Sequence, residues 1–303
     1  MNELRPRAQL CIAVIALVAL AMAMLTMRIP GALEVERLSL ALLLTGLLTA
    51  AMMFPLHLGY KTKFALDTAV IFAAILIFEP GTAMLIAASG MLLASAVHRA
   101  PWDQTIFNAA QAALQAGVGG LILAVGGWDS SNLSLDRPER WLLILVAAGA
   151  MHVVNTLSVA TIIGLQSGQP PLLIWRRSVG IYGVEHLSQL VLGLLTAVVA
   201  DSHPWALPLL LVPALAVYRS TERNLLLRTQ TLDAVEALAD LVDMRDPYTA
   251  DHSARVACYA RELATALALS PDDVALVERA ARVHDVGKVV VDSDVLIKEG
   301  RLT

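Results

Sequence analysis

Long apolar runs alternate with short polar or Pro/Gly-containing breaks from the N-terminus to about residue 218. A helix needs about 20 apolar residues to cross a bilayer, and runs of about that length recur here. The pattern therefore predicts a bundle of about eight membrane helices within residues 1–218, with six or seven as alternatives. The expected spans are residues 8–27, 37–56, 64–79, 81–98, 105–126, 141–165, 179–200 and 204–218.

The pattern changes at about residue 219, where charged and apolar positions begin to alternate. Residues 219–245 contain neither Pro nor Gly, and their apolar positions follow a heptad-like spacing that Arg228 interrupts. This stretch predicts a cytoplasmic connector helix that continues the last membrane helix. A homodimer formed through the connector is one expectation, and a single amphipathic helix that packs into the next domain is the plainer one.

Residues 246–303 predict further helices after the Pro-containing break that begins at Arg245. The first helix contains His252. The second has Ser270 as N-cap candidate and Pro271 at its first position, and it ends near Asp285. Its expected inward-facing residues are Val274, Leu276, Val277, Ala280 and Val283. The chain is thus predicted to be all-α: a polytopic membrane bundle, a connector helix and a partial helical domain.

Composition supports the membrane assignment. Hydrophobic residues make up 57% of the 303 residues and charged residues only 16%, which is too apolar for a soluble protein of this length. The net charge of -4 gives no reason to expect nucleic-acid binding. Cys11 lies in the first apolar run and Cys258 in the polar part, so we expect no disulfide between them.

Basic residues near the expected spans predict the orientation of the bundle. With the N-terminus in the cytoplasm, the cytoplasmic segments before residue 219 hold more Lys and Arg than the outer segments. The cytoplasmic set is Arg5, Arg7, Lys61, Lys63, Arg99, Arg176 and Arg177, and the outer set is Arg28, Arg37, Arg137 and Arg140. This positive-inside bias places the polar C-terminal part in the cytoplasm too.

Several polar residues lie within the expected spans, where contact with lipid is costly. They share helix faces on the fifth, sixth and seventh spans. These residues are Asn108, Gln111, Gln115, His152, Asn155, Glu185, His186 and Gln189. One interpretation is a ligand pocket, which would make the bundle a sensor, and the other is interhelical hydrogen bonding that holds the bundle together. A transporter with a regulatory tail is a further alternative.

The C-terminal part contains the residue types of a metal site. His252 and the adjacent pair His284 and Asp285 come from two separate predicted helices that can face one another. An imidazole from each helix and a carboxylate able to bridge are suitable ligands for a divalent metal. Lys288 can supply positive charge to a phosphate group, and the metal can activate a bound water.

The run "RDPYTADHSARV", followed by "AARVHDVGK" and "KEGRLT", resembles the HD phosphohydrolase superfamily, and its HD-GYP branch in particular. The resemblance implies a bacterial phosphodiesterase that hydrolyses cyclic di-GMP at a two- or three-metal site. It also implies that His252, His284 and Asp285 are metal ligands, with Asp285 bridging, and that Lys288 contacts the scissile phosphate. Tyr248 stands where three-metal members have a glutamate, so two divalent ions, such as Fe or Mn, are expected.

The membrane half has a looser likeness. "FNAAQ", at residues 107–111, and the Gly-rich run after it are similar to the multi-span modules fused to bacterial HD-GYP domains. The resemblance implies a multi-pass signalling protein of the bacterial inner membrane.

The chain also departs from the family pattern. Family members continue beyond Thr303 into helices that add histidine ligands, a final aspartate and the GYP signature, and Val290 and Asp292 replace a usual glycine and proline. We therefore expect this chain alone to be poorly active or inactive. The alternatives are a non-catalytic sensor or scaffold with a vestigial HD domain, and a hydrolase of another phosphorylated nucleotide.

Overall fold

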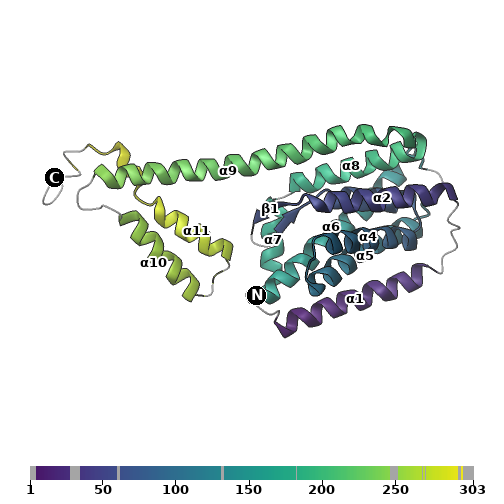
Figure 1. The fold of residues 1–303 in the computed structure, drawn as a ribbon, viewed down its shortest axis with the longest axis horizontal. Helices are drawn as coiled ribbons and strands as arrows, with labels where there is room; N and C mark the ends of the chain where they lie inside the picture. Colours follow the sequence, from purple (N-terminus) through teal and green to yellow (C-terminus); the bar gives the residue numbers. More distant parts are fainter. Residues whose placement is uncertain are drawn as a thin grey trace. The chain divides into compact units, whose positions relative to one another are not determined.

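The structure is a computed structural model of the chain, and it describes residues 5–27, 35–59, 62–130, 133–181, 183–245, 252–267, 269, 271–292 and 295. The elements, in chain order, are α1 (Pro6–Thr26), α2 (Val35–Met53), β1 (Leu56–Gly59), β2 (Thr62–Phe64), α3 (Asp67–Ile77), α4 (Pro80–Val97), α5 (Trp102–Val125), α6 (Pro138–Ser167), α7 (Pro171–Ile181), α8 (Gly183–Ser202), the 3-10 helix η1 (Pro204–Leu210), α9 (Leu211–Arg245), α10 (His252–Ala266), α11 (Pro271–Arg282) and the 3-10 helix η2 (Val286–Val290) (Figure 1). The expected all-α architecture is confirmed. The small β1–β2 hairpin is an addition that the pattern did not predict.

Proline and glycine set several helix boundaries in the bundle. Pro6, Pro80 and Pro138 are the first residues of α1, α4 and α6, where the missing N–H costs no intrahelical hydrogen bond. Gly168 ends α6 in the left-handed conformation, with φ of 80°, and donates its N–H to the carbonyl oxygen of Gly164. These local signals explain why the apolar runs divide where they do.

The chain divides into two compact units. The first comprises Met1–Leu56 and Lys63–Arg219, and the second comprises His57–Thr62 and Ser220–Thr303. The helix α9 is continuous from Leu211 to Arg245, so its first turns belong to the first unit and the remainder to the second.

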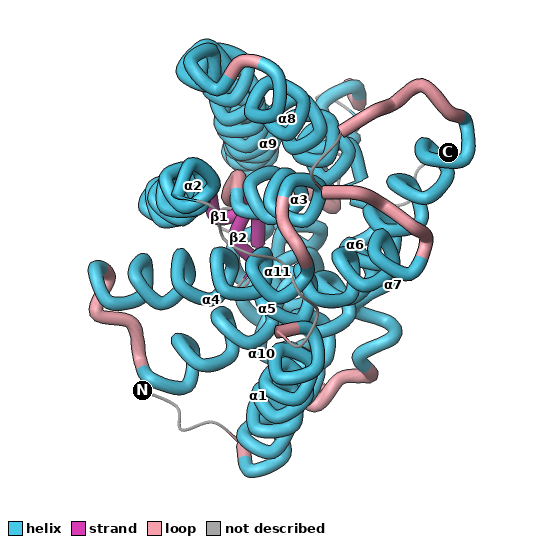
Figure 2. The backbone as a smooth tube through the Cα atoms, turned by 90° about the vertical axis from the view of Figure 1, so that its right-hand side faces the viewer, coloured by secondary structure: helices cyan, strands magenta, loops and turns pink. Residues whose placement is uncertain are grey.

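Helix α3 forms the centre of the first unit. It packs against α2, α4, α5 and α8, and Figure 2 shows it among α2, α5 and α8. Residues such as Ile71, Phe72 and Leu76 are fully or almost fully buried. With 11 residues at about 1.5 Å each, α3 is about 16 Å long, well short of a hydrocarbon core about 30 Å thick. The predicted third span, 64–79, is therefore too long. Its first residue belongs to strand β2, and the helix itself runs from Asp67 to Ile77.

Two other expected spans also differ from the structure. The seventh, 179–200, begins in α7 and continues in α8, so its residues belong to two helices. The eighth, 204–218, begins as η1, which contains Pro204 and Pro208, and becomes α-helical only at Leu211. Proline cannot donate a backbone hydrogen bond, which explains the irregular start.

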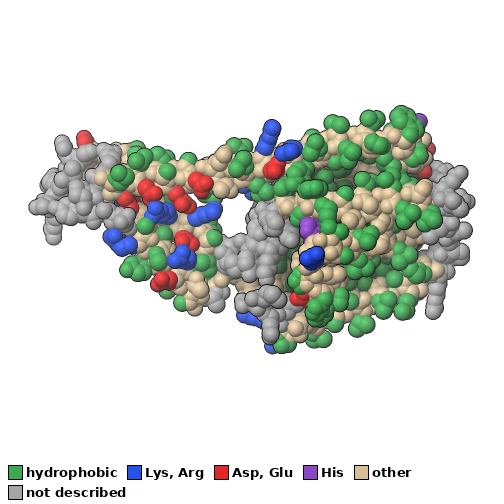
Figure 3. Space-filling model, in the orientation of Figure 1, with side chains coloured by type: hydrophobic (Ala, Val, Ile, Leu, Met, Phe, Trp, Pro, Cys, Tyr) green, Lys and Arg blue, Asp and Glu red, His purple; other side chains and the backbone are tan. Residues whose placement is uncertain are grey.

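Four described helices, α1, α4, α5 and α6, are long and apolar enough to cross a membrane. Helix α1 also exposes large apolar side chains, among them Leu10, Leu17 and Leu25. Hydrophobic side chains cover much of the visible face of the first unit, whereas acidic and basic side chains gather on the second (Figure 3). An apolar outer surface of this kind is typical of a helix bundle in lipid. The larger number of about eight spans stays a prediction.

In the second unit, helices α10 and α11 pack against each other. Arg261 of α10 pairs with Glu278 of α11 at 3.1 Å, and Arg282 of α11 pairs with Asp240 of α9 at 2.5 Å. The predicted inward face of α11 is wrong in part, because Leu276 is 66% exposed and Ala280 is also exposed. Helix α10 packs against α11, yet these two positions stay exposed among the described residues.

Candidate metal centre

Three side chains that the sequence singled out lie together in the second unit. His252 is the first residue of α10, whereas His284 and Asp285 lie in the turn between α11 and η2. Their candidate ligand atoms all lie within 4.8 Å of one another, and the two imidazole centroids are 5.4 Å apart. The pair His284 and Asp285 therefore follows α11 in a turn, just beyond the helix that was expected to contain it.

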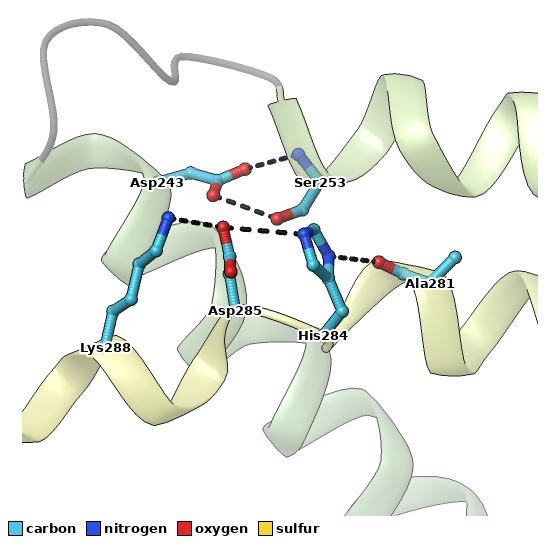
Figure 4. Close-up of polar contacts among 6 residues, drawn as sticks. All are labelled: Asp243, Ser253, Ala281, His284, Asp285 and Lys288. Carbon is cyan, nitrogen blue, oxygen red and sulfur yellow. Dashed lines mark hydrogen bonds and ion pairs between the residues drawn. The ribbon is translucent and has the colours of Figure 1, made fainter.

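Hydrogen bonding orients the imidazole of His284. Its Nδ1 lies 2.8 Å from the carbonyl oxygen of Ala281 (Figure 4). A carbonyl oxygen can only accept, so in the neutral imidazole Nδ1 carries the proton and Nε2 presents its lone pair. That Nε2 lies 3.5 Å from Oδ2 of Asp285. Two lone-pair atoms this close favour a cation between or beside them, and a carbonyl bonded to the second nitrogen is the usual arrangement of a metal-binding histidine.

Lys288 supplies a positive charge at the same carboxylate. Its Nζ donates a hydrogen bond of 2.5 Å to Oδ2 of Asp285, from one turn further along the chain. Burial raises the pKa of Asp285, but the hydrogen bond from Lys288 and the nearby His284, Lys288 and His252 outweigh it, so the pKa lies below its usual value. Asp285 is therefore held ionised, which is the form that binds a metal.

The donor set suits a divalent ion. Imidazole suits Fe and Zn and carboxylate suits Mn, so two imidazoles and one carboxylate can hold any of these divalent ions. The site is also accessible: the His284 side chain is 38% exposed and that of Asp285 is 20% exposed. Among the described residues of the second unit, His252, His284 and Asp285 form one cluster that could hold a metal ion.

A second polar contact lies beside this cluster, and sequence reasoning missed it. Asp243, in the last turns of α9, accepts hydrogen bonds from the backbone N–H and the hydroxyl of Ser253, the residue after His252. Both side chains are buried. The available signal was weak: an aspartate near the end of a predicted helix, and a serine beside a candidate ligand.

The structure says less about the other residues of the C-terminal part that the sequence singled out. Tyr248 and the C-terminal residues from 296 onward lie outside the described residues, and Asp292 is exposed after η2. Val290, at a position where the family usually has a glycine, is 87% exposed at the end of η2.

Four of the polar residues that the sequence singled out in the bundle make side-chain contacts between helices. Gln111 of α5 donates to Oδ1 of Asn155 on α6 at 2.7 Å, and the Asn155 amide lies 3.5 Å from the Thr68 hydroxyl of α3. The rings of His152 and His186 meet edge to face with centroids 4.6 Å apart.

The remaining members of this polar set are placed less completely. Asn108 is partly buried in α5, and the side chain of Glu185 lies outside the described side chains. Gln115 and Gln189 are buried. Among the described residues, neither amide atom of Gln115 nor Oε1 of Gln189 has a hydrogen-bond partner.

Comparison with known proteins finds the HD domain family in the second unit, where the family model matches residues 249–301. The chain is 46% identical over 68 residues to the 3'3'-cGAMP-specific phosphodiesterase 3 of Vibrio cholerae serotype O1, which covers 22% of this chain and 15% of that protein. It is 37% identical over 95 residues to the "Probable cyclic di-GMP phosphodiesterase" of the same organism, which covers 27% of this chain and 22% of that protein.

A third relative is the cyclic di-GMP phosphodiesterase response regulator RpfG of Xanthomonas campestris pv. campestris, 35% identical over 71 residues, which cover 23% of this chain and 19% of that protein. The chain thus spans between 15% and 22% of the length of these three relatives. No solved structure matches the chain. Residues 249–301 belong to the HD domain family, and the expected resemblance to HD-GYP-type phosphohydrolases is confirmed for this segment.

Proposed function

We propose that the second unit is the metal-binding part of a phosphodiesterase that opens cyclic dinucleotides, with cyclic di-GMP as the first candidate substrate. The observation that carries the proposal is the convergence of His252, His284 and Asp285, with ligand atoms within 4.8 Å, in a segment of the HD domain family. Relatives named for cyclic di-GMP and for 3'3'-cGAMP support the substrate class. Another phosphorylated nucleotide is the alternative substrate.

Each residue has a proposed role. His252, His284 and Asp285 would hold divalent ions, Fe, Mn or similar, with Asp285 as the ligand that two ions would share in a complete centre. A divalent ion held there would supply Lewis acidity and an activated water. Lys288, whose ammonium contacts Asp285, is proposed to contact an oxygen of the scissile phosphate.

Hydrolysis is tested with the purified 303-residue chain, Mn²⁺ and either cyclic di-GMP or 3'3'-cGAMP, with the linear product separated by chromatography. We expect slow, Mn²⁺-dependent ring opening, because three ligand groups are fewer than a two-metal clamp uses. Asp285→Ala should abolish it, and Asp292→Ala, which changes an exposed carboxylate outside the cluster, is the matched control. Equal product with Asp285→Ala would exclude this site. Metal binding without any hydrolysis would favour the non-catalytic scaffold.

We also propose that the first unit anchors the protein in the bacterial inner membrane, as a multi-pass bundle with the N-terminus and the HD segment in the cytoplasm. The four long apolar helices and the exposed leucines of α1 support this proposal. We expect the protein to remain in the membrane pellet after an alkaline carbonate wash. Release into the supernatant would contradict the proposal.

The polar face of the bundle is proposed as a sensor for a ligand. It comprises Asn108, Gln111, His152, Asn155, Glu185 and His186. The contacts Gln111–Asn155 and His152–His186 bring together four of these residues from α5, α6 and α8, and buried amides nearby add hydrogen-bonding capacity.

We also propose a homodimer that forms through α9. The heptad-like spacing of its apolar residues supports this proposal, and the exposed side chains of Leu238 and Leu241 offer apolar surface for the contact.

A further inference from the structure

The buried contact between Asp243 and Ser253 joins the last turns of α9 to the first turn of α10. Oδ2 of Asp243 accepts the backbone N–H of Ser253 at 2.8 Å, and Oδ1 accepts its hydroxyl at 2.9 Å (Figure 4). Asp243 is 7% exposed and Ser253 is 0% exposed. Each oxygen of one buried carboxylate thus accepts a hydrogen bond from the same residue of the neighbouring helix.

This contact acts at the start of α10, where backbone N–H groups have no partner within the helix. Ser253 is the second residue of α10 and His252 is the first. A carboxylate that holds the N–H and the hydroxyl of Ser253 fixes the backbone from which the imidazole of His252 projects. The negative charge also suits the positive end of the α10 dipole.

The same end of α9 holds the other half of the cluster. Asp240, one turn before Asp243, pairs with Arg282 at 2.5 Å, and Arg282 lies two residues before His284. The side chain of Asp240 is 50% exposed and that of Arg282 is 24% exposed, so this ion pair is a weaker restraint than the buried contact of Asp243. The elements that carry both histidines are therefore attached to the last turns of α9.

We propose that Asp243 is a positioning residue for the metal centre: through Ser253 it sets the place of His252, and it makes the geometry of the site depend on α9. The inference rests on the proposed metal-binding function of His252, His284 and Asp285. Since α9 extends without interruption from Leu211, a shift of its last turns would carry His252 through Asp243 and Ser253. His284 and Asp285 are tied to α9 only through the weaker Asp240–Arg282 pair, so the shift would move one metal ligand against the other two.

The test measures Mn²⁺ binding to the full chain in detergent by EPR, which reports the free ion and the line shape of the bound ion. Asp243→Ala should weaken Mn²⁺ binding about 10- to 100-fold and alter the line shape at saturating Mn²⁺. Asp243→Asn should recover most of the affinity, because its amide oxygen can accept the Ser253 N–H while its NH₂ donates to the Ser253 hydroxyl. A purely structural role would lower thermal stability without changing that line shape.

Asp233→Ala is the matched control, since it removes an exposed carboxylate from the same helix, and it should leave binding unchanged. Ser253→Ala removes only the hydroxyl bond and should weaken binding to an intermediate extent, which keeps the test in force if Asp243→Ala does not fold. If the folded variants bind Mn²⁺ within about twofold of the wild type while His252→Ala binds it much more weakly, the inference is overturned and the proposed function stands. If the wild type itself binds no Mn²⁺, both are overturned.

Discussion

Lys288 and a bound metal ion would compete for one oxygen atom. The ammonium of Lys288 lies 2.5 Å from Oδ2 of Asp285, and the same oxygen lies 3.5 Å from Nε2 of His284. A metal ligated by these two atoms would displace Lys288 from the carboxylate and leave its ammonium available for a phosphate. The lysine can therefore neutralise Asp285 in the metal-free protein and contact the substrate in the loaded one.

Lys288→Met should consequently change the affinity for Mn²⁺ and the affinity for cyclic di-GMP in opposite directions. We expect Mn²⁺ affinity to rise about 1.5- to 5-fold, the range for a partly exposed charge pair, because a competing cation is removed. Binding of cyclic di-GMP to the Mn²⁺-loaded protein should weaken. Isothermal titration calorimetry measures both, with Arg279→Met, an exposed cation of α11, as control. A fall in Mn²⁺ affinity would mean that Lys288 supports the metal ligands rather than competing with them.

Residue types and order were enough to predict that His252, His284 and Asp285 can face one another, because consecutive helices joined by a short connection usually pack side by side. The partnership of Asp243 with Ser253 was beyond sequence reasoning. It depends on where the last turns of α9 lie against α10, and an aspartate in a helix is usually a solvated side chain.

At the scale of elements, close packing of small residues holds α8 against α3. A Cβ atom at Gly193 would lie 2.5 Å from the carbonyl oxygen of Ala69 and 3.1 Å from Phe72. The first neighbour is backbone and cannot rotate away, so the helices approach as closely as they do only because residue 193 is glycine. Gly149, also within a helix, has no atom within 4 Å of such a Cβ among the described residues.

Gly193→Ala should therefore separate α8 from α3 and lower the free energy of unfolding by about 1–3 kcal/mol, the usual cost of overpacking. Gly149→Ala makes the same chemical change in open space and should be neutral or stabilising by up to about 1 kcal/mol. Thermal denaturation of both variants in detergent gives the comparison. Equal midpoints for the two variants would contradict the packing of α3 against α8.

The hydrophobic pattern predicted the existence of most helices and missed the role of α3. A continuous apolar run looks the same whether a short helix is buried by other helices or a longer one is in contact with lipid. Only the packing of α2, α4, α5 and α8 around α3 separates the two cases. Likewise, the spacing of Leu276 and Ala280 indicated an apolar face on α11 but could not show which element would cover it.

Considered as a whole, the molecule combines an apolar bundle with a charged helical unit whose residues 249–301 match the HD domain family, and α9 belongs to both. The large apolar side chains exposed on α1 and the ion pairs of α10 and α11 indicate different surroundings for the two units. In our proposal a signal received by the bundle reaches the metal ligands through α9 and Asp243. That proposal requires that the cluster bind metal through both histidines.

Pulsed EPR of Mn²⁺ bound to the full chain tests this requirement most directly, because the echo modulation detects nitrogen nuclei coordinated to the ion. We predict modulation from two imidazoles in the wild type and from one in each of His252→Ala and His284→Ala. His203→Ala, which changes a histidine of the first unit, should leave the signal unchanged. Bound Mn²⁺ without nitrogen modulation, or with the same modulation in all four proteins, would contradict the account.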